Sequence, residues 1–227
     1  MQKIFETYGT LLQANPLFHN LAPSGIPMVL THLQATVKSY HKETYVKSTG
    51  DKMDFIALVL TGKVHVLQDD YYGNRSITAS ISAGSLFAEA FACAGVPFLP
   101  VDIVAAEDCT VMYLNSNILF HACDGSCQFH HIIIQNLLGI VARKNITLNQ
   151  KLKYTSRKTT GEKLLSYLND QAKAKKSNEF TIPFNRQELA DYLGVERSAM
   201  SVEISKLVKL GILETQRSQF KLLKPEE

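Results

Sequence analysis

The sequence predicts an α+β fold in which a β-rich N-terminal part, one long helix and a small, mainly helical C-terminal part follow one another along 227 residues. Short β-like runs between glycine and aspartate turns predict an N-terminal antiparallel β-barrel of the jelly-roll (double-stranded β-helix) type. A strict heptad of apolar residues predicts the long helix. Two short helical stretches hinged at a glycine occupy residues 185–210. We therefore expect a barrel domain over residues 1–125, a long helix over 126–156 and a C-terminal domain over 157–227.

The composition is that of a globular protein, with 45% apolar and 20% charged residues. Residues 1–150 hold nine Lys and Arg against eleven Asp and Glu, whereas residues 151–227 hold fifteen against ten. The basic excess therefore lies in the C-terminal part, where contact with a polyanion would need it. The first ten residues lack the apolar core of a signal peptide, and no apolar run approaches the ~18 residues of a membrane-spanning helix. Four cysteines do not suggest a disulfide framework in a chain of this size, so we expect a cytoplasmic protein with no membrane segment.

The barrel is predicted from a series of short strands in residues 37–114. Turn residues separate the strands, and no helix-length apolar period interrupts the series before Ser116. The predicted strands are Tyr40–Val46, Phe55–Leu60, Val64–Leu67, Ser76–Ser82, Val101–Ala106 and Thr110–Leu114. Ser116 can cap a short helix, which Asp124-Gly125-Ser126 would end.

The long helix is predicted from about Cys127 to about Thr155. Five apolar residues and one Asn, with spacings of 4, 3, 4, 3 and 4, form a heptad seam that consists of Ile134, Leu138, Val141, Asn145, Leu148 and Leu152. A single Asn at an a position favours parallel pairing of two helices, so this seam predicts a homodimer. A second stripe, Ile133, Leu137 and Ile140, could pack on the barrel. The alternative is a helix wholly buried in its own domain, with Asn145 exposed.

The segment Tyr154–Thr160 is polar and basic, and we expect it to be a joint. Thr159 and Glu162 form a capping box that starts the next helix. A short strand at Phe180–Phe184 leads into the two hinged helices, after which Ile212–Gln216 and Gln219–Leu223 flank the turn Arg217-Ser218. This hairpin would lie beside the second helix as a wing.

Residues 185–210 carry the most specific local pattern. Asn185 can cap a first helix, Glu188 completes a capping box, and Gly194 stands where the chain must turn. A second helix would bury Met200, Ile204 and Leu207. Its opposite face would carry short hydrogen-bonding groups and cations, namely Arg197, Ser198, Ser201 and Lys206. Such groups can contact base edges and phosphates in a major groove, which predicts a helix-turn-helix; two packed surface helices without this role are the alternative.

Two stretches resemble the Crp/Fnr family of transcription regulators, which are related to the cyclic-AMP receptor protein and FNR. Tyr40–Ala92, which contains TGDKMDF and AGSLFAEAFA, is similar to the family's barrel. Phe180–Leu213 (FTIPFNRQELADYLGVERSAMSVEISKLVKLGIL) is similar to its winged helix-turn-helix and is the more specific match. The resemblance covers almost the whole chain. It implies a cyclic-nucleotide-binding-like sensor barrel, a long dimerisation helix and a DNA-binding domain.

The resemblance departs from the family at the cyclic-nucleotide site. Nucleotide-binding members hold the cyclic phosphate with an Arg-Ser pair, whereas this sequence has Leu99 and Pro100 there and no Lys or Arg in residues 76–142. A buried phosphate needs a cation or well-aimed backbone donors, so we expect neither cyclic AMP nor another cofactor. Glu89 matches a glutamate that contacts ribose in binders, with a structural carboxylate as the alternative. The candidate pocket would suit a neutral aromatic or hydrophobic effector, or be empty, and consists of Ser85, Phe87, Glu89, Phe98, Leu99 and Thr147.

No metal site is predicted. FNR-type members hold an iron–sulfur cluster on cysteines near the N-terminus, and this chain has none before Cys93. Five potential ligands within eleven residues raise a metal, haem or redox role, namely His121, Cys123, Cys127, His130 and His131. The break at Asp124-Gly125 and a spacing that matches no zinc pattern argue against it.

These patterns predict a homodimeric, sequence-specific regulator on an approximately palindromic duplex, in contact with RNA polymerase if it activates transcription. The predicted DNA-binding residues are Arg186, Gln187, Arg197, Ser198, Ser201, Val202, Lys206 and Arg217. Of these, Arg186, Gln187 and Lys206 would hold phosphates. Val202 stands where the family often has Arg. One contact with guanine would therefore be either missing or replaced by a contact with a thymine methyl.

The sequence predicts no enzyme, because no Ser/His/Asp set, phosphate-cradling glycine loop or HExxH motif is present. A different class of function is the alternative to DNA binding. It is a ligand- or redox-sensing module whose helix-turn-helix mediates protein–protein contacts.

Overall fold

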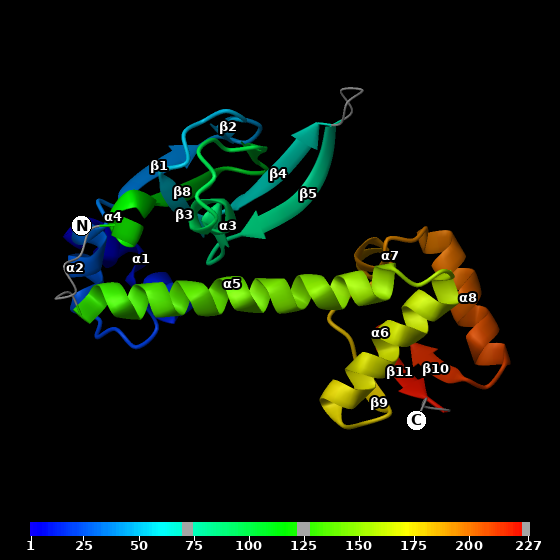
Figure 1. The fold of residues 1–227 in the computed structure, drawn as a ribbon. Helices are drawn as coiled ribbons and strands as arrows, with labels where there is room; N and C mark the ends of the chain where they lie inside the picture. Colours follow the sequence, from blue (N-terminus) through cyan, green and yellow to red (C-terminus); the bar gives the residue numbers. More distant parts are fainter. Residues whose placement is uncertain (70–74, 122–127, 224–227) are drawn as a thin grey trace. The chain divides into compact units, whose positions relative to one another are not determined.

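The computed structural model describes residues 1–69, 75–121 and 128–223 (Figure 1). The chain divides into two compact units, residues 1–142 and residues 143–227. Among the described residues, no helix is both long and apolar enough to cross a membrane.

Two four-stranded antiparallel sheets form the centre of the first unit. The first sheet has the order β1-β8-β3-β6 and consists of Thr36–Tyr40, Cys109–Asn115, Phe55–Thr61 and Leu86–Phe87. The second has the order β2-β7-β4-β5 and consists of Tyr45–Lys47, Asp102–Ala105, Lys63–Asp69 and Arg75–Ser82. The predicted jelly-roll arrangement is confirmed, with one difference: no pairing between the described strands closes the two sheets into a barrel.

The run Tyr40–Val46, predicted as one strand, is divided between the two sheets. β1 ends at Tyr40 and β2 begins at Tyr45. Between them Thr44 N donates to the carbonyl of His41 at 3.1 Å, and Glu43 has φ +67°. This turn takes the chain from an edge strand of one sheet to an edge strand of the other, so a continuous strand in this place was a wrong prediction.

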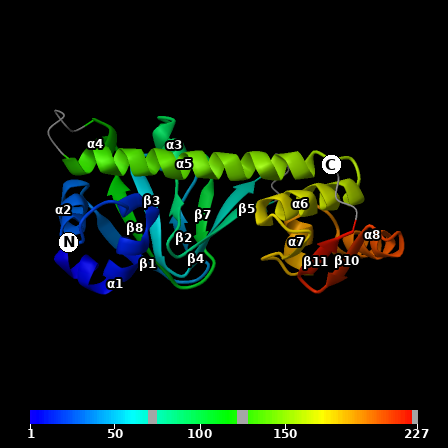
Figure 2. The ribbon, with the colours of Figure 1, turned by 90° about the horizontal axis from the view of Figure 1, so that it is seen from below.

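Helices complete the first unit. They are α1 (Gln2–Ala14), the 3-10 helix η1 (Pro16–Phe18), α2 (Gly25–His32), α3 (Glu89–Cys93), α4 (Ser116–His121) and the first part of α5 (Gln128–Thr155). On α5, Ile133, Leu137 and Ile140 are 1%, 2% and 8% exposed and belong to the same hydrophobic cluster as the strand residues. Figure 2 shows this part of α5 alongside the strands. The prediction that this stripe packs on the sheets is confirmed.

The second unit combines three helices with a small sheet. The helices are α6 (Thr160–Lys175), α7 (Arg186–Leu193) and α8 (Arg197–Lys209), and the antiparallel sheet β10-β11-β9 consists of Leu213–Gln216, Gln219–Leu222 and Glu179–Thr181. The predicted capping box of α6 is present. Thr159 Oγ1 accepts from Glu162 N, and Glu162 Oε2 accepts from Thr159 N, both at 3.2 Å.

The last turn of α5 belongs to the core of the second unit. Tyr154 is 3% exposed, and its hydroxyl donates to Asp170 Oδ2 at 3.0 Å. Lys153 Nζ contacts both oxygens of the same carboxylate, at 2.8 and 2.7 Å. The Tyr154 ring meets that of Tyr167 edge-on, with 5.5 Å between centroids. The segment predicted as a polar joint therefore begins with a core residue, because the buried ring and the shared carboxylate fix it on α6.

Candidate nucleic-acid interface

The helix-turn-helix begins and turns where the sequence predicts. Asn185 Oδ1 accepts from Glu188 N at 3.0 Å, and Glu188 Oε2 accepts from Asn185 N at 2.7 Å, which is the predicted capping box. Gly194 ends α7 with φ +62°, a left-handed conformation that strains residues with a Cβ. The chain is therefore turned by local chemistry directly before α8.

α8 has one buried face and one exposed face. Met200, Ile204 and Leu207 are 0%, 6% and 4% exposed and lie in the core, as their spacing predicts. The exposed face carries Arg197, Ser198, Ser201 and Val202, and the Val202 side chain is 68% exposed. Within the described part of the chain, the Arg197 guanidinium has no hydrogen-bond partner.

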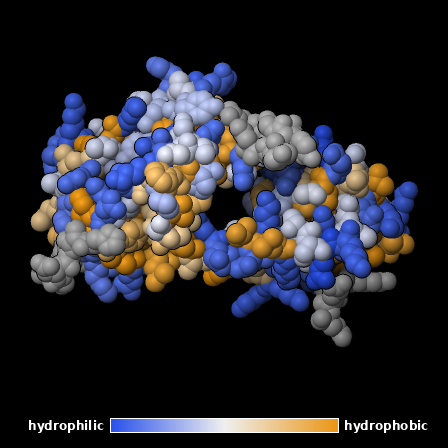
Figure 3. All heavy atoms as spheres, turned by 45° about the horizontal axis from the view of Figure 1, so that its top comes forward, coloured by the Kyte–Doolittle hydropathy of each residue, from blue (hydrophilic) through white to orange (hydrophobic). Residues whose placement is uncertain are grey.

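The polar groups of this face are bonded along the helix. Ser201 Oγ donates to the Arg197 carbonyl at 2.9 Å, which leaves the hydroxyl oxygen able to accept. Lys206 Nζ contacts Glu203 Oε1 at 3.2 Å in an exposed pair, which stabilises the helix by no more than about 0.5 kcal/mol. An open hollow of about 600 Å³ follows the face and is lined by Ser201, Val202, Ser205, Lys206, Lys209 and Leu210. Figure 3 shows hydrophilic and hydrophobic residues intermixed over this unit.

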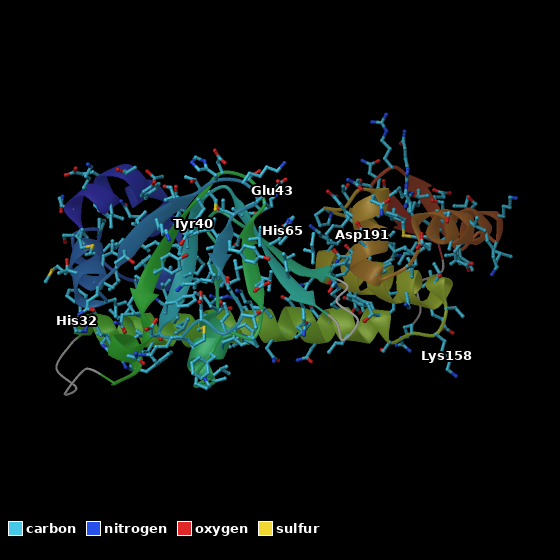
Figure 4. All side chains as sticks on the ribbon, turned by 90° about the horizontal axis from the view of Figure 1, so that it is seen from above. His32, Tyr40, Glu43, His65, Lys158 and Asp191 are labelled. Carbon is cyan, nitrogen blue, oxygen red and sulfur yellow. The ribbon has the colours of Figure 1, made fainter. Side chains whose placement is uncertain are left out.

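The residues predicted to hold phosphates, and Arg217 of the predicted wing, differ in exposure. Gln187 is exposed on α7, and its Nε2 donates to Oδ1 of Asp191, which Figure 4 labels, at 2.8 Å. Arg217 is exposed in the hairpin turn. Arg186 is half-buried: its Nη2 donates to Thr215 Oγ1 at 2.9 Å, and burial lowers the pKa of its guanidinium. Lys206, Gln187 and Arg217 thus present polar groups to solvent, whereas Arg186 faces the hairpin.

The residues predicted for an effector pocket lie in different environments. Phe87 and Leu99 are 2% and 1% exposed and belong to the core of the first unit. Glu89 is 4% exposed, whereas Ser85 is exposed and Phe98 is 59% exposed. Thr147 lies in the second unit, where its hydroxyl donates to the Arg143 carbonyl at 3.0 Å.

Sequence reasoning missed a hollow beside Phe98. It measures about 540 Å³ and is lined mainly by Met53, Val96, Pro97 and Phe120, with Lys52 and Asn117. Of its lining residues only Phe98 was predicted for a pocket, because the hollow depends on α4 packing near the segment that follows α3.

The heptad seam of α5 is exposed in the single chain. Ile134, Leu138, Leu148 and Leu152 are 38%, 68%, 57% and 55% exposed. Val141 is half-buried, and Asn145 is exposed and accepts a hydrogen bond from Asn149 Nδ2 at 2.7 Å. The helix is therefore not wholly buried in its own domain, which was the alternative.

The predicted cluster of histidines and cysteines is only partly described. Cys123 and Cys127 lie outside the described residues, as does the side chain of His121. The Nε2 of His130 is hydrogen-bonded to the Leu119 carbonyl, and His131 is exposed. Over residues 1–69, 75–121 and 128–223 there is no group of three or more His, Cys, Asp or Glu residues that could hold a metal ion.

Comparisons with known proteins agree with both units. The family model of a cyclic nucleotide-binding domain matches residues 37–126, and that of a Crp-like helix-turn-helix domain matches residues 162–227. The transcriptional activator protein FnrL of Cereibacter sphaeroides is 27% identical over 191 residues, which are 78% of this chain and 71% of FnrL.

Solved structures share the fold at low sequence identity. The catabolite activator protein of Thermus thermophilus matches with a TM-score of 0.52 and 20% identity, over 92% of this chain and 93% of that chain. DNR of Pseudomonas aeruginosa matches with a TM-score of 0.52 and 19% identity, over 96% and 95%. With a sensor-type sheet domain, a long helix and a Crp-like helix-turn-helix in one chain, this protein belongs to the Crp/Fnr family of DNA-binding transcription regulators.

Proposed function

We propose that the protein is a homodimeric, sequence-specific transcription regulator in which α8 is the recognition helix. The observation that carries the proposal is the division of α8 into a face sealed in the core and a face of exposed arginine, hydroxyls and valine. A helix of this kind can enter a major groove, which admits an α-helix and presents a distinct pattern for each base pair.

Each exposed group of α8 suits a contact with DNA. The Arg197 guanidinium, which has no partner in the described residues, can donate two parallel hydrogen bonds to a guanine. Ser198 can donate to or accept from base edges, Ser201 can accept while its proton stays on the Arg197 carbonyl, and Val202 can pack on a thymine methyl. Gln187, Lys206 and Arg217 are the candidates for phosphate contacts, which position the helix without reading sequence.

The exposed seam of α5 supports a dimer. Leu138, Leu148 and Leu152 are each more than half exposed. Burial of the exposed part against a second copy would be favourable by about 1–2 kcal/mol each. Asn145 in the same seam favours parallel pairing of two helices. Two recognition helices would then enter successive major grooves about 34–36 Å apart on a roughly palindromic site.

We propose that the first unit binds an effector other than a cyclic nucleotide, or that it binds no effector. The absence of Lys and Arg from residues 76–142 leaves a buried phosphate without a side-chain cation. Titration calorimetry with cyclic AMP and cyclic GMP should give no binding heat. Saturable binding of either nucleotide with one molecule per chain would overturn this part of the proposal.

The relatives favour a role in activation. FnrL is named as a transcriptional activator and the Thermus thermophilus protein as a catabolite activator. By analogy this protein would bind upstream of a promoter and contact RNA polymerase. In vitro transcription from a promoter that carries the selected binding site should rise when the protein is added, and a fall would assign it to repression.

Affinity for duplex DNA as a function of salt tests the DNA-binding proposal. Each phosphate neutralised by a Lys or Arg should contribute about −0.9 to the slope of log affinity against log salt. On a selected duplex, Arg197→Ala should lose about 1–3 kcal/mol of specific binding and relax the preference at one base pair of each half-site. Arg143→Ala removes the same charge from an exposed position of α5 and is the matched control. Affinity that does not change with salt would instead favour protein–protein contact.

A further inference from the structure

Arg186, the first residue of α7, directs its guanidinium to the hairpin β10–β11. Its Nη2 donates to Thr215 Oγ1 at 2.9 Å, and its Cζ lies 4.8 Å from the centroid of the Phe220 ring. Thr215 and Phe220 are paired across the hairpin, and Phe220 is 1% exposed. A single guanidinium therefore contacts both strands of the wing close to the turn.

The Thr215 hydroxyl extends this contact. It accepts from Arg186 and donates to the Gln219 carbonyl at 2.9 Å. A hydroxyl has one proton to donate and lone pairs with which to accept, so both bonds can form together. The result is a continuous chain of hydrogen bonds from Arg186, at the start of α7, to Gln219, just after the turn.

The turn itself is held on its other side by Ser218. Ser218 Oγ donates to the Phe184 carbonyl at 3.1 Å, and its own carbonyl accepts from Ile182 N at 3.0 Å. Both contacts reach the segment that leads into α7. The turn is thus fixed to the helix-turn-helix by contacts on either side of Arg217.

Arg217 needs such support. Its φ of +54° lies in the left-handed region, which glycine and asparagine adopt readily and arginine adopts with strain. The arrangement keeps an exposed cation at the tip of the wing, although glycine there would relieve the strain. The Arg217 side chain is exposed there and is accessible to a phosphate.

Arg186 is placed at a cost to its own hydrogen bonding. Its Nη1 is buried and has no hydrogen-bond partner among the described residues. A buried donor without a partner is rare in native proteins. Packing of the helix-turn-helix alone does not explain why a cation, and not an apolar side chain, fills this place above Phe220.

We infer that Arg186 is a positioning residue that fixes the wing so that Arg217 contacts the DNA backbone. The inference rests on the proposed DNA binding and departs from a direct phosphate contact by Arg186. Its central element is the bond to Thr215, which can be removed while the charge of Arg186 stays in place.

Thr215→Val in the intact protein removes the hydrogen bond from Arg186 and keeps the charge of Arg186. Valine suits a strand position and changes no charge, and it removes both the acceptor for Arg186 and the donor to the Gln219 carbonyl. Arg186→Met removes only the first of these two hydrogen bonds and therefore assigns the effect to Arg186 in the assay without DNA. Thr181→Val is the matched control, since Thr181 lies in the neighbouring strand β9, pairs with Gln219 and has an exposed side chain without a hydrogen bond in the described structure. The first readout needs no DNA: it is the rate of trypsin cleavage after Arg217, followed by mass spectrometry. The second is affinity for duplex DNA and its salt dependence.

We expect Arg186→Met to speed cleavage after Arg217 about tenfold, as loss of one hydrogen bond to a charged group would, and Thr215→Val to speed it at least as much. DNA binding should weaken several-fold, and the salt slope should fall by about 0.9, which corresponds to one phosphate contact. In an Arg217→Ala background, Thr215→Val should have no further effect on DNA binding. Thr181→Val should behave as the wild type in both assays.

Two results would overturn the inference while leaving the proposed function intact. One is cleavage of Thr215→Val at the wild-type rate, which would mean that Arg186 does not hold the wing. The other is an affinity loss that is as large in the Arg217→Ala background as in the wild type, because Arg186 would then act independently of Arg217. A wild-type protein that binds no duplex DNA would refute the proposed function, and the inference with it, whereas the cleavage rates would still show whether Arg186 anchors the wing.

Discussion

Replacement of Tyr154 by phenylalanine removes one hydroxyl and keeps the ring that joins the end of α5 to the second unit. The hydroxyl donates to Asp170 Oδ2 at 3.0 Å, and the ring packs on Tyr167 at 3% residual exposure. The change creates no cavity among the rings. Any loss of stability therefore reports on the hydrogen bond.

The magnitude follows from the charge of the acceptor. A hydrogen bond to a charged group contributes about 1.5–3 kcal/mol. Lys153 Nζ still contacts both oxygens of Asp170, at 2.8 and 2.7 Å, so the carboxylate is not left unpaired. We therefore expect the lower end, about 1.5 kcal/mol, which is roughly a tenfold change in the opening equilibrium of this unit.

Hydrogen exchange of the intact protein, measured by mass spectrometry on peptides from α6 and α7, provides the assay. The slowest amides of these helices should exchange about tenfold faster in Tyr154→Phe, because their exchange follows opening of the unit. Tyr192→Phe is the matched control. Its ring lies in the same aromatic cluster, 6.2 Å from that of Tyr154, but its hydroxyl has no hydrogen bond within the described residues.

Equal exchange rates in the two variants would refute this reasoning. They would mean that the ring contacts alone hold the end of α5, and that the bond to Asp170 adds nothing. Faster exchange in α1 or α2 would also contradict it, since these helices belong to the other unit.

Three further predictions concern dimerisation, a turn and alkaline pH. Leu138→Glu should weaken the dimer at least about thirtyfold in sedimentation equilibrium, since each of the two subunits would forgo about 1–2 kcal/mol of burial. An unchanged mass would exclude α5 as the seam. Gly62→Ala should lower the free energy of unfolding by more than about 1 kcal/mol, because φ is +73° and a Cβ would lie 2.3 Å from the Asp108 carbonyl oxygen. Gly50→Ala should lower it less, because φ is +90° but a Cβ there would meet open space. Equal urea midpoints for the two variants would contradict this prediction. Burial raises the pKa of Tyr167 from 10.0 to about 12, so between these pH values the folded state keeps a proton that the unfolded chain has released. Thermal stability should therefore fall as the pH rises from 10 towards 12. The fall should be smaller in Tyr167→Phe.

The helix-turn-helix could be predicted from the sequence because its signals are local. Asn185 and Glu188 satisfy each other within one helical turn, and Gly194 ends the helix by its own backbone freedom. The heptad seam is equally readable, since its spacing alone places Leu138 and Leu148 on one face of α5. Both features are encoded by residues close together in the sequence and do not depend on distant contacts.

Features that depend on distant packing could not be predicted. The division of Tyr40–Val46 between two sheets follows from which edges the strands join, and no local residue encodes it. The two-residue turn Arg217-Ser218 implies that Thr215 pairs with Phe220 across the hairpin, so this pair could be predicted from the sequence. That Arg186 reaches it depends on how α7 packs against the sheet.

The candidate effector pocket illustrates the same limit. Phe87 and Phe98 are both aromatic residues of one short stretch, yet one is 2% and the other 59% exposed. Their burial is decided by the sheets and helices around them. Resemblance places both near a family site, but only the packed structure assigns Phe87 to the core.

The most direct test of the central claim is selection of binding sites from random duplex DNA by the purified protein without added effector. We predict enrichment of a two-fold symmetric site whose half-sites are one helical turn apart, as two copies of α8 would require. Arg197→Ala should enrich a site with one position relaxed in each half. Failure to enrich any sequence, with or without cell extract, would contradict the claim that this protein reads DNA.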